Sequence, residues 1–581
     1  MLRRESIEGL RWGVRARHLT AAAVAAASFA GLPVALATPA HADTATLTPA
    51  QLAADGGSLA SITNLIGAQE LWKNGFTGQG VDVAVIDTGV TPVPGLAGKV
   101  IDGPDLSLDS QDPDLANLDA FGHGTHMASI IAGSDLPAGL AKSAKKCDTC
   151  VNESPYSDIT KFEGVAPSSR IVNVKVGAAD GSVDVSQVIA GINWVTEHRN
   201  DNGMNIRVLN LSFGTQSVQP WQVDPLSYAV DVAWQKGIVV VVSAGNDGLD
   251  VGQPLADPAN NPHVLAVGAV DTQGTTKDDD DTVPSFASHG RADRTVDLVA
   301  PGSHVLGLRV PGSYIDENYP GGTVNDRFQR GSGTSEAAAV TSGAAALLLS
   351  RFPTATPDAI KNLLTDRARG MKTGLFKQAM ANLAATAYPG IKPDQALKLL
   401  LQQGSDGVTK VNVNDLLSDL YSGNGRLDLH SVPGDLPKPK SAKGSQDDNS
   451  TTGGVAVGTG SLELARGGVH LMAADGTPLT GEIDIFGQAW NGSRWSSETF
   501  AGSTWTGGLW NGSRWSGDGW TGSRWSGSRW SGSDWTGSRW SGSRWSGSRW
   551  SGSRWSGSRW SGSRWSGDDW SGSRWSGSLW S

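Results

Sequence analysis

Cysteine is almost absent from this 581-residue chain, which contains only Cys147 and Cys150, in the sequence CDTC. The usual four-ligand zinc sites need more cysteine or histidine than the surrounding sequence offers, so we expect no zinc site here. If the chain is secreted, this spacing favours a local disulfide, and redox activity is the alternative. The pair is therefore a disulfide candidate.

Excess positive charge is also missing, because the formal net charge is −10. That balance argues against a nucleic-acid partner for the chain as a whole. The charge is unevenly spread, however: residues 491–581 carry 11 arginines, no lysine and 5 acidic residues, a net charge of +6. An acidic body is thus followed by a basic tail.

Long apolar runs are confined to the N-terminus. There, five arginines precede an uncharged, alanine-rich stretch at 19–40, and the small-residue sequence AHA follows at 40–42. This pattern is typical of a secretory signal peptide, with cleavage expected after Ala42. An uncleaved membrane anchor is the alternative. The first interpretation predicts a protein that is secreted or associated with the cell surface.

Short apolar runs alternate with amphipathic segments in the middle of the chain. The runs are rich in β-branched residues and predict buried strands at 81–87, 171–176, 206–212, 238–243 and 263–270. Helical patterns lie at 184–198, 225–236 and 334–351. This alternation favours a three-layer α/β domain with a mostly parallel sheet.

Shifts in composition divide the chain into segments. After the signal peptide at 1–42, we expect a short N-terminal segment at 43–65, the α/β domain at 66–431 with an extra helical segment at about 373–420, a linker at 432–454, a small β-like segment at 455–487 and a repeat region at 488–581. The linker is rich in proline, glycine, serine and charge.

The repeat region is built from the pentapeptide WSGSR. An aromatic residue occupies every fifth position from Trp490 to Trp580. A period of five matches neither a helix nor an alternating strand, and there are no aliphatic residues for a core, so we expect a flexible tail without a compact fold. Tryptophan beside arginine suits binding to a cell-wall glycan or an anionic polymer. A sticky spacer without a specific ligand is the alternative.

Four polar residues stand at strand ends or helix starts of the α/β domain: Asp87, His123, Asn246 and Ser335. Each alone is weak evidence of function. Together they supply a hydroxyl nucleophile, a base, a carboxylate to orient that base and a donor for an oxyanion, which are the groups that acyl transfer needs.

The order Asp, His, Ser and the sequences VAVIDTGV, GHGTHMA, LNLSFG, VVSAGN and GTSEAAA closely resemble those of the subtilases, the subtilisin-like serine peptidases, over about residues 66–430. The resemblance implies a subtilisin-like fold and polypeptide substrates. It implies that Ser335 attacks the scissile carbonyl, His123 acts as general base and acid, Asp87 orients His123, and Asn246 donates to the oxyanion.

The same resemblance assigns substrate-binding edges. Ser212 and Gly214 would form one edge for an extended peptide, with Gly181 and Ser182 opposite. His126, one helical turn after His123, is expected to be a packing residue. The chemistry requires no cofactor, and a monomer is expected.

Three features depart from the family pattern. Glu336 follows the nucleophile where the family commonly has methionine, and a carboxylate there would raise the pKa of His123. Between Ala42 and Ile66 there is no room for the usual pro-domain. The family's calcium loop is not recognisable; the acidic run at 277–281 is a candidate calcium site, but we assign no metal.

Two functions fit these residues. The first is a secreted serine endopeptidase whose tail retains it at a surface or captures substrate. The second is a cell-surface adhesin whose subtilase-like domain is inactive or processes only itself. The two differ in whether Ser335 turns over a substrate.

Overall fold

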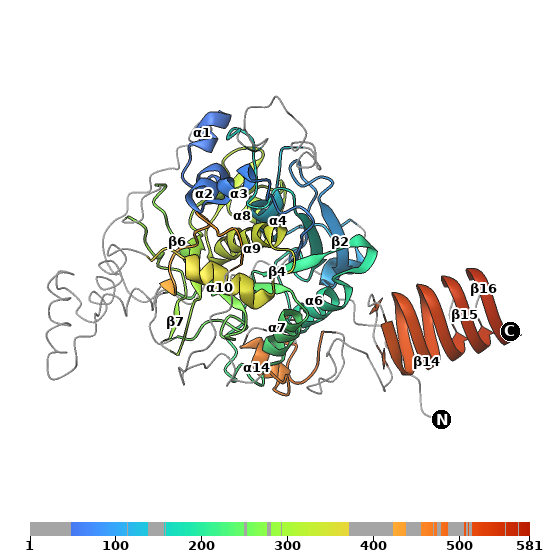
Figure 1. The fold of residues 1–581 in the computed structure, drawn as a ribbon. Coiled ribbons are helices and arrows are strands. Elements are labelled where there is room, and N and C mark those ends of the chain that lie inside the picture. The colour runs from blue at the N-terminus through green and yellow to red at the C-terminus, as the bar shows by residue number, and fades with distance from the viewer. Residues whose placement is uncertain are drawn as a thin grey trace, which may run out of the picture.

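A seven-stranded parallel sheet lies at the centre of the molecule (Figure 1), in the strand order β2-β3-β1-β4-β5-β6-β9. Its strands are β1 (Asp82–Asp87), β2 (Val100–Asp105), β3 (Arg170–Lys175), β4 (Ile206–Leu211), β5 (Val239–Ser243), β6 (Leu265–Val270) and β9 (Leu298–Pro301). The computed structural model describes residues 48–580 except 113, 137–155, 157, 249–252, 276–279, 292, 371–421, 437–454, 469, 473–477, 486–504, 507–508, 511–513, 552–553 and 567–568.

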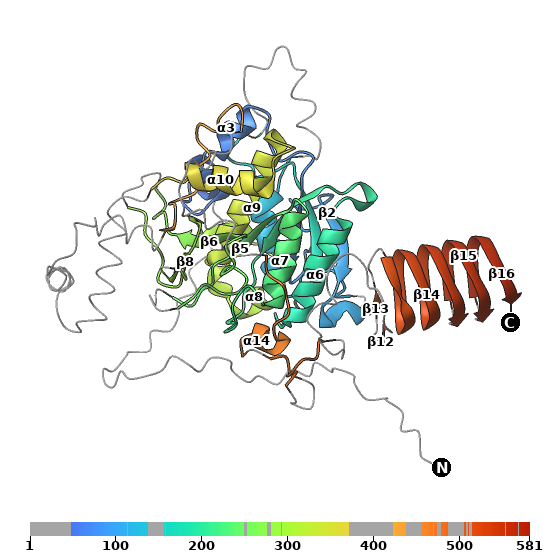
Figure 2. The same cartoon turned by 60° about the horizontal axis from the view of Figure 1, so that its bottom comes forward.

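Helices cover both faces of the sheet, which makes the predicted three layers. Helices α4 (His123–Ala132) and α9 (Thr334–Arg351) pack against each other (Figure 1). Helix α6 (Val185–His198) packs against α7 (Pro225–Gln235), as Figure 2 shows. Every residue of β1, β5 and β6 is buried, because these strands have helices on both sides. The α/β fold with a mostly parallel sheet is confirmed, and all five expected strands lie within two residues of their predicted bounds.

Smaller elements complete the body. They are α1 (Pro49–Ala53), α2 (Leu59–Leu65), α3 (Ala68–Lys73), α8 (Tyr314–Asn318), α10 (Pro357–Arg367), β7 (Gly290–Arg291), β8 (Arg294–Thr295), β10 (Val305–Leu308), β11 (Phe328–Gly331) and three short 3₁₀ turns, Leu108–Gln111, Asp201–Gly203 and Pro320–Gly322. Leu59 and Ile62 of α2 belong to the same hydrophobic core as the sheet. The domain therefore begins earlier than the predicted boundary at residue 66.

The segment expected to be β-like contains a helix instead, α14 (Leu462–Arg466). Ser461 caps its first turn by accepting a hydrogen bond from Leu464, and Gly467 ends it in the left-handed conformation. Leu462 and Ala465 are buried in the main core. The start and stop signals of a short helix thus outweigh the β-like composition of this segment.

The backbone of the repeat region forms five strands within its described residues: β12 (Trp505–Thr506), β13 (Leu509–Trp510), β14 (Arg514–Ser551), β15 (Arg554–Ser566) and β16 (Asp569–Trp580). Pairing is parallel at an offset of three pentapeptides, so that Trp540 pairs with Trp555 and Trp555 with Trp570. The flexible tail that the composition predicts stays a prediction. Because the offset is a multiple of five, most residues pair with their own kind; Arg554, opposite Asp569, and Arg564, opposite Leu579, are exceptions. Backbone hydrogen bonds join the strands without an aliphatic core.

Several sequence-based predictions lie outside the described residues, namely the signal peptide, the helical segment at about 373–420 and most of the linker at 432–454. Within the described part of the chain, no helix has the length and apolar character needed to cross a bilayer.

Candidate active site

Asp87 and His123 form a hydrogen-bonded pair at the carboxyl edge of the sheet. Asp87 is the last residue of β1 and is buried, whereas His123 is the first residue of α4 and its side chain is 25% exposed. The His123 Nδ1 atom lies 2.8 Å from Asp87 Oδ1. A carboxylate at this nitrogen orients the imidazole and leaves Nε2 to exchange a proton with a nucleophile.

The turn that presents His123 depends on Asp119, a residue that the motifs did not identify. Its carboxylate accepts hydrogen bonds from the backbone N–H groups of Gly122 (2.7 Å) and Thr125 (2.7 Å) and from the hydroxyl of Thr88 (2.8 Å). Burial raises the pKa of Asp119, and these donors oppose the rise. An acidic residue four positions before a helix start was the available signal.

The electrostatic environment of His123 favours its protonated form. Burial opposes the imidazolium, but the charge and hydrogen bond of Asp87, followed by the charge of Glu336, outweigh burial and raise the pKa of His123 from 6.5 to about 9. An imidazole with this pKa holds firmly the proton it would take from a nucleophile.

Ser335 lies in the first turn of α9, at the end of the helix that packs against α4. It is buried except for 9% of its surface. Gly333 precedes the helix in extended conformation, and Ser212 Oγ donates to the Ser335 carbonyl oxygen at 3.4 Å. The nucleophile predicted from the sequence thus stands at a helix N-terminus, where partial positive charge favours a developing anion.

Asn246 is held with its amide nitrogen toward this helix start. Its Oδ1 accepts from the Thr334 N–H at 2.9 Å and from the Thr334 hydroxyl at 3.1 Å. Because the backbone N–H is a donor, the other end of the amide must be Nδ2. A Cβ atom placed on Gly333 would lie 3.3 Å from that Nδ2. The arrangement places a hydrogen-bond donor near Gly333, two residues before Ser335.

Glu336 lies inside the protein rather than on its surface. Only 5% of the residue is exposed, and its Oε1 lies 3.7 Å from Nε2 of His126, which is also buried. Burial raises the pKa of Glu336, and the charge of His123 opposes that rise. Burial also lowers the pKa of His126 to about 3, so this histidine is neutral at ordinary pH. His126 is accordingly placed as a buried packing residue.

The two predicted substrate edges flank Asp87. Strand β1 lies between β3 and β4. The chain leaves β3 into the turn that contains Gly181 and Ser182, and it leaves β4 into Ser212 and Gly214. All four residues therefore follow the carboxyl ends of the two strands beside Asp87, the edge where open α/β sheets bind ligands.

Other predicted sites have different outcomes. Cys147 and Cys150 lie outside the described residues. In the acidic run at 277–281, the described Asp281 pairs with Arg426, and both side chains are buried. The part of the chain that the structure describes contains no cluster of three or more metal-ligating side chains.

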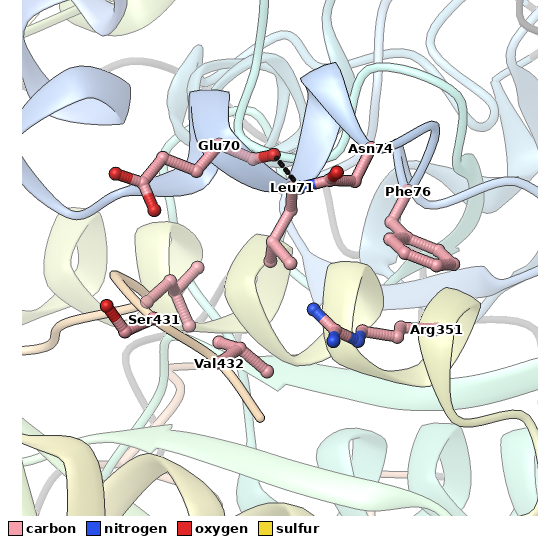
Figure 3. A pocket seen from close by; sticks show the side chains of 8 residues that line it. Glu70, Leu71, Asn74, Phe76, Arg351, Ser431 and Val432 are labelled. Carbon is pink, nitrogen blue, oxygen red and sulfur yellow. Dashed lines mark hydrogen bonds between the residues drawn. The ribbon is translucent and has the colours of Figure 1, made fainter. Parts of the chain in front are cut away.

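A pocket of about 310 Å³ lies at the other end of α9 (Figure 3), between Glu70 and Leu71 of α3, Arg351 and the segment at 429–432. Ser335 and Arg351 are sixteen residues apart on one helix, which corresponds to about 24 Å. This pocket is therefore not part of the triad site.

Comparisons with known proteins identify the family of the chain. The model of the subtilase family matches residues 78–406, more than half of the chain. The serine protease AprX of Bacillus subtilis (strain 168) is 36% identical over 334 residues, 56% of this chain and 70% of its own length. Subtilisin DY of Bacillus licheniformis is 30% identical over 325 residues, 56% of this chain and 96% of its own. The crystal structure of a cold adapted subtilisin-like serine proteinase is 29% identical in the aligned region, with a TM-score of 0.37. The alignment covers 52% of this chain and 85% of the chain in that structure. On the family model and the two relatives, the chain belongs to the subtilase family.

Proposed function

We propose that this protein is a serine endopeptidase that hydrolyses peptide bonds through an acyl-enzyme formed on Ser335. The observation that carries the proposal is the 2.8 Å hydrogen bond between His123 Nδ1 and Asp87, together with the orientation of Asn246. A scaffold kept only for adhesion would not need a buried carboxylate bonded to a partly exposed histidine near a helix-start serine.

The proposed reaction follows from these positions. His123 Nε2 takes the proton of Ser335 Oγ as the oxygen attacks the scissile carbonyl, and Asp87 stabilises the resulting imidazolium. Asn246 Nδ2 and the Ser335 N–H donate to the oxyanion. When the tetrahedral intermediate collapses, the C–N bond breaks and His123 gives its proton to the leaving amine. Water, deprotonated by His123, then attacks the ester, and as the C–O bond to Ser335 breaks, His123 returns the proton to Ser335 Oγ.

Labelling with a fluorophosphonate tests this assignment. We expect the probe to label the folded protein on Ser335 and the protein to hydrolyse casein. Ser335→Ala should abolish both, whereas the control Ser332→Ala should retain both, because Ser332 accepts a hydrogen bond from the His304 N–H outside the triad. Folded protein that neither reacts with the probe nor hydrolyses casein would leave the inactive adhesin as the better interpretation.

We further propose that the repeat region binds cell-wall glycan or an anionic polymer. The pairing at an offset of three pentapeptides supports this, because it brings the Trp and Arg positions of successive strands into rows. Deletion of residues 490–581 should weaken retention on cell-wall material and leave hydrolysis of small peptides unchanged. Equal retention of the full-length and shortened proteins would indicate a spacer without a ligand.

The proposed location is outside the cell or at its surface. This follows from the pattern of a signal peptide at residues 1–42. Intact-mass analysis of protein from the culture medium should show an N-terminus at Asp43. An intact N-terminus on membrane-bound protein would instead support the anchor.

A further inference from the structure

The segment after the predicted linker, residues 455–485, is docked on the peptidase domain; we refer to its described residues as the strap. Leu462 and Ala465 are buried in the domain core, and the Ala456 N–H donates to Asp231 Oδ2 at 2.8 Å. In Figure 2 the helix of the strap, α14, lies near the ends of α6 and α7. The strap therefore covers the part of the domain where α6 and α7 begin.

The strap contacts one substrate edge through a buried ion pair. Arg466 Nε donates to Asp184 Oδ2 at 2.7 Å, and both side chains are 1% exposed. Asp184 caps the start of α6 and follows Ser182 by two residues. Further along the strap, the Ile485 N–H donates to Ser186 Oγ at 3.1 Å. The edge that contains Gly181 and Ser182 is therefore anchored to the strap just beyond its end.

The strap contacts the opposite edge with the next residues of its chain. Gly467 lies against Gln216, two residues after Gly214, so closely that a Cβ atom on Gly467 would lie 2.5 Å from the Gln216 nitrogen. Two hydrogen bonds join Ser461 to Gln219. The Ser461 N–H donates to Gln219 Oε1 at 3.0 Å, and Gln219 Nε2 donates to the Ser461 carbonyl at 2.8 Å. The Gly460 N–H donates to the Val223 carbonyl at 2.7 Å.

Arg466 also ties the strap to itself. Its Nη1 donates to the Gly481 carbonyl at 2.7 Å and to Glu463 at 3.1 Å, and its Nη2 donates to the Ile483 carbonyl. A buried guanidinium with this many acceptors holds its surroundings in one arrangement, since moving any of them would leave a buried polar group without a partner.

We propose that the strap sets the spacing between the two edges of the substrate groove and thereby positions extended peptides, a role that rests on the proposed peptidase function. Consecutive residues, Arg466 and Gly467, contact Asp184 and Gln216, each of which lies two positions beyond one of the opposite edges. Main-chain pairing of a peptide with two edges requires a fixed separation between them, because hydrogen bonds weaken steeply with distance and angle. The strap is thus a positioning element for substrate residues away from the scissile bond.

Two neighbouring glycines give a matched test in the full-length protein. Both are left-handed, with φ of 66° at Gly467 and 88° at Gly468, but a Cβ atom on Gly468 meets nothing within 4 Å. Gly467→Ala and Gly468→Ala therefore share the backbone strain. Only Gly467→Ala places a Cβ atom against Gln216 and so pushes the strap away from the edge that contains Gly214.

The measurement is the kcat/KM for a tetrapeptide anilide divided by that for a small activated ester, which uses the triad but not the edges. We expect Gly467→Ala to lower this ratio roughly threefold to tenfold, because the KM for the anilide rises. A change of this size corresponds to the loss of one or two hydrogen bonds between the peptide and the edges. Gly468→Ala should leave the ratio unchanged. Arg466→Met, which removes the ion pair but keeps an apolar stem, should lower the ratio in the same way.

The outcomes separate this proposal from the peptidase assignment. An equal ratio in Gly467→Ala and Gly468→Ala would overturn the positioning role. A higher ratio in Gly467→Ala would also overturn it, because it would show that the strap obstructs long substrates. Loss of both ester turnover and fluorophosphonate labelling in the unmodified protein would instead overturn the proposed function itself.

Discussion

Replacing Glu336 by glutamine should extend activity to lower pH. The substitution keeps the size of the side chain and removes its charge. In the structure, the charge of Glu336 is one of the contributions that raise the pKa of His123 to about 9. Because the reaction needs His123 as a neutral base, activity rises with pH through this pKa. Without Glu336 the pKa of His123 falls, so neutral imidazole is present at lower pH.

The size of the shift can be bounded from the order of the contributions. The pKa of His123 rises from 6.5 to about 9 against the effect of burial, and both contributions of Asp87 exceed that of Glu336. Glu336 therefore supplies less than a third of the contributions that oppose burial, and we expect its removal to lower the midpoint by about 0.5–1 pH unit, or roughly 0.7–1.4 kcal/mol. The assay is kcat/KM for a small ester across the range below and above pH 9, which reports the ionisation of the free enzyme.

Asp247→Asn provides the control. Asp247 is an exposed carboxylate next to Asn246 and is hydrogen-bonded to Gln216 at 2.6 Å. Since solvent screens the charge of Asp247, the substitution should leave the midpoint of the pH–activity profile unchanged. A midpoint in Glu336→Gln that stays in place or moves upward would refute the reasoning, because it would mean that Glu336 is uncharged while His123 titrates.

Three further results are expected. Asn246→Ala should lower kcat by about 10²–10³ with little change in KM, the loss known for the equivalent donor of subtilisin itself, as steady-state kinetics would show. Lys175→Met should reduce the free energy of unfolding by about 3–5 kcal/mol in denaturant titrations, because the 2.9 Å ion pair of Lys175 with Asp109 is buried and the substitution leaves the carboxylate behind. Gly331→Ala should cost about 1–3 kcal/mol of stability by overpacking, since its Cβ atom would lie 2.0 Å from Glu336 Oε1, whereas Gly321→Ala meets nothing within 4 Å and should be neutral.

The central sheet was predictable because strands buried on both faces consist of continuous runs of β-branched residues, as in VVVVS of β5. Strand β2 was missed for the opposite reason. The run VIDGPD of β2 contains two aspartates, a glycine and a proline, and only one of its residues is fully buried. It lies at the edge of the sheet, where residues unsuited to a central strand are tolerated.

The candidate site was predictable where chemistry restricts residue type within a short motif, as at His123 and Ser335. The supporting contacts were not, because they join residues far apart in sequence. Arg466 and Asp184 are 282 positions apart, and no local pattern in either segment indicates the other. Asp119 was missed although it is near His123, because an acidic residue in a loop usually serves a solvated turn.

Glu336 and the two glycines before Ser335 act as one unit. A Cβ atom on Gly331 would lie 2.0 Å from Glu336 Oε1, and one on Gly333 would lie 2.8 Å from Oε2, so a carboxylate fits behind Ser335 only with glycine at both positions. The start of α9 stabilises that carboxylate by about 0.3–1 kcal/mol, and protonated His123 stabilises it further. By linkage, the carboxylate stabilises protonated His123 to the same extent. Glu336 therefore adds to the effect of Asp87 on the pH at which His123 loses its proton.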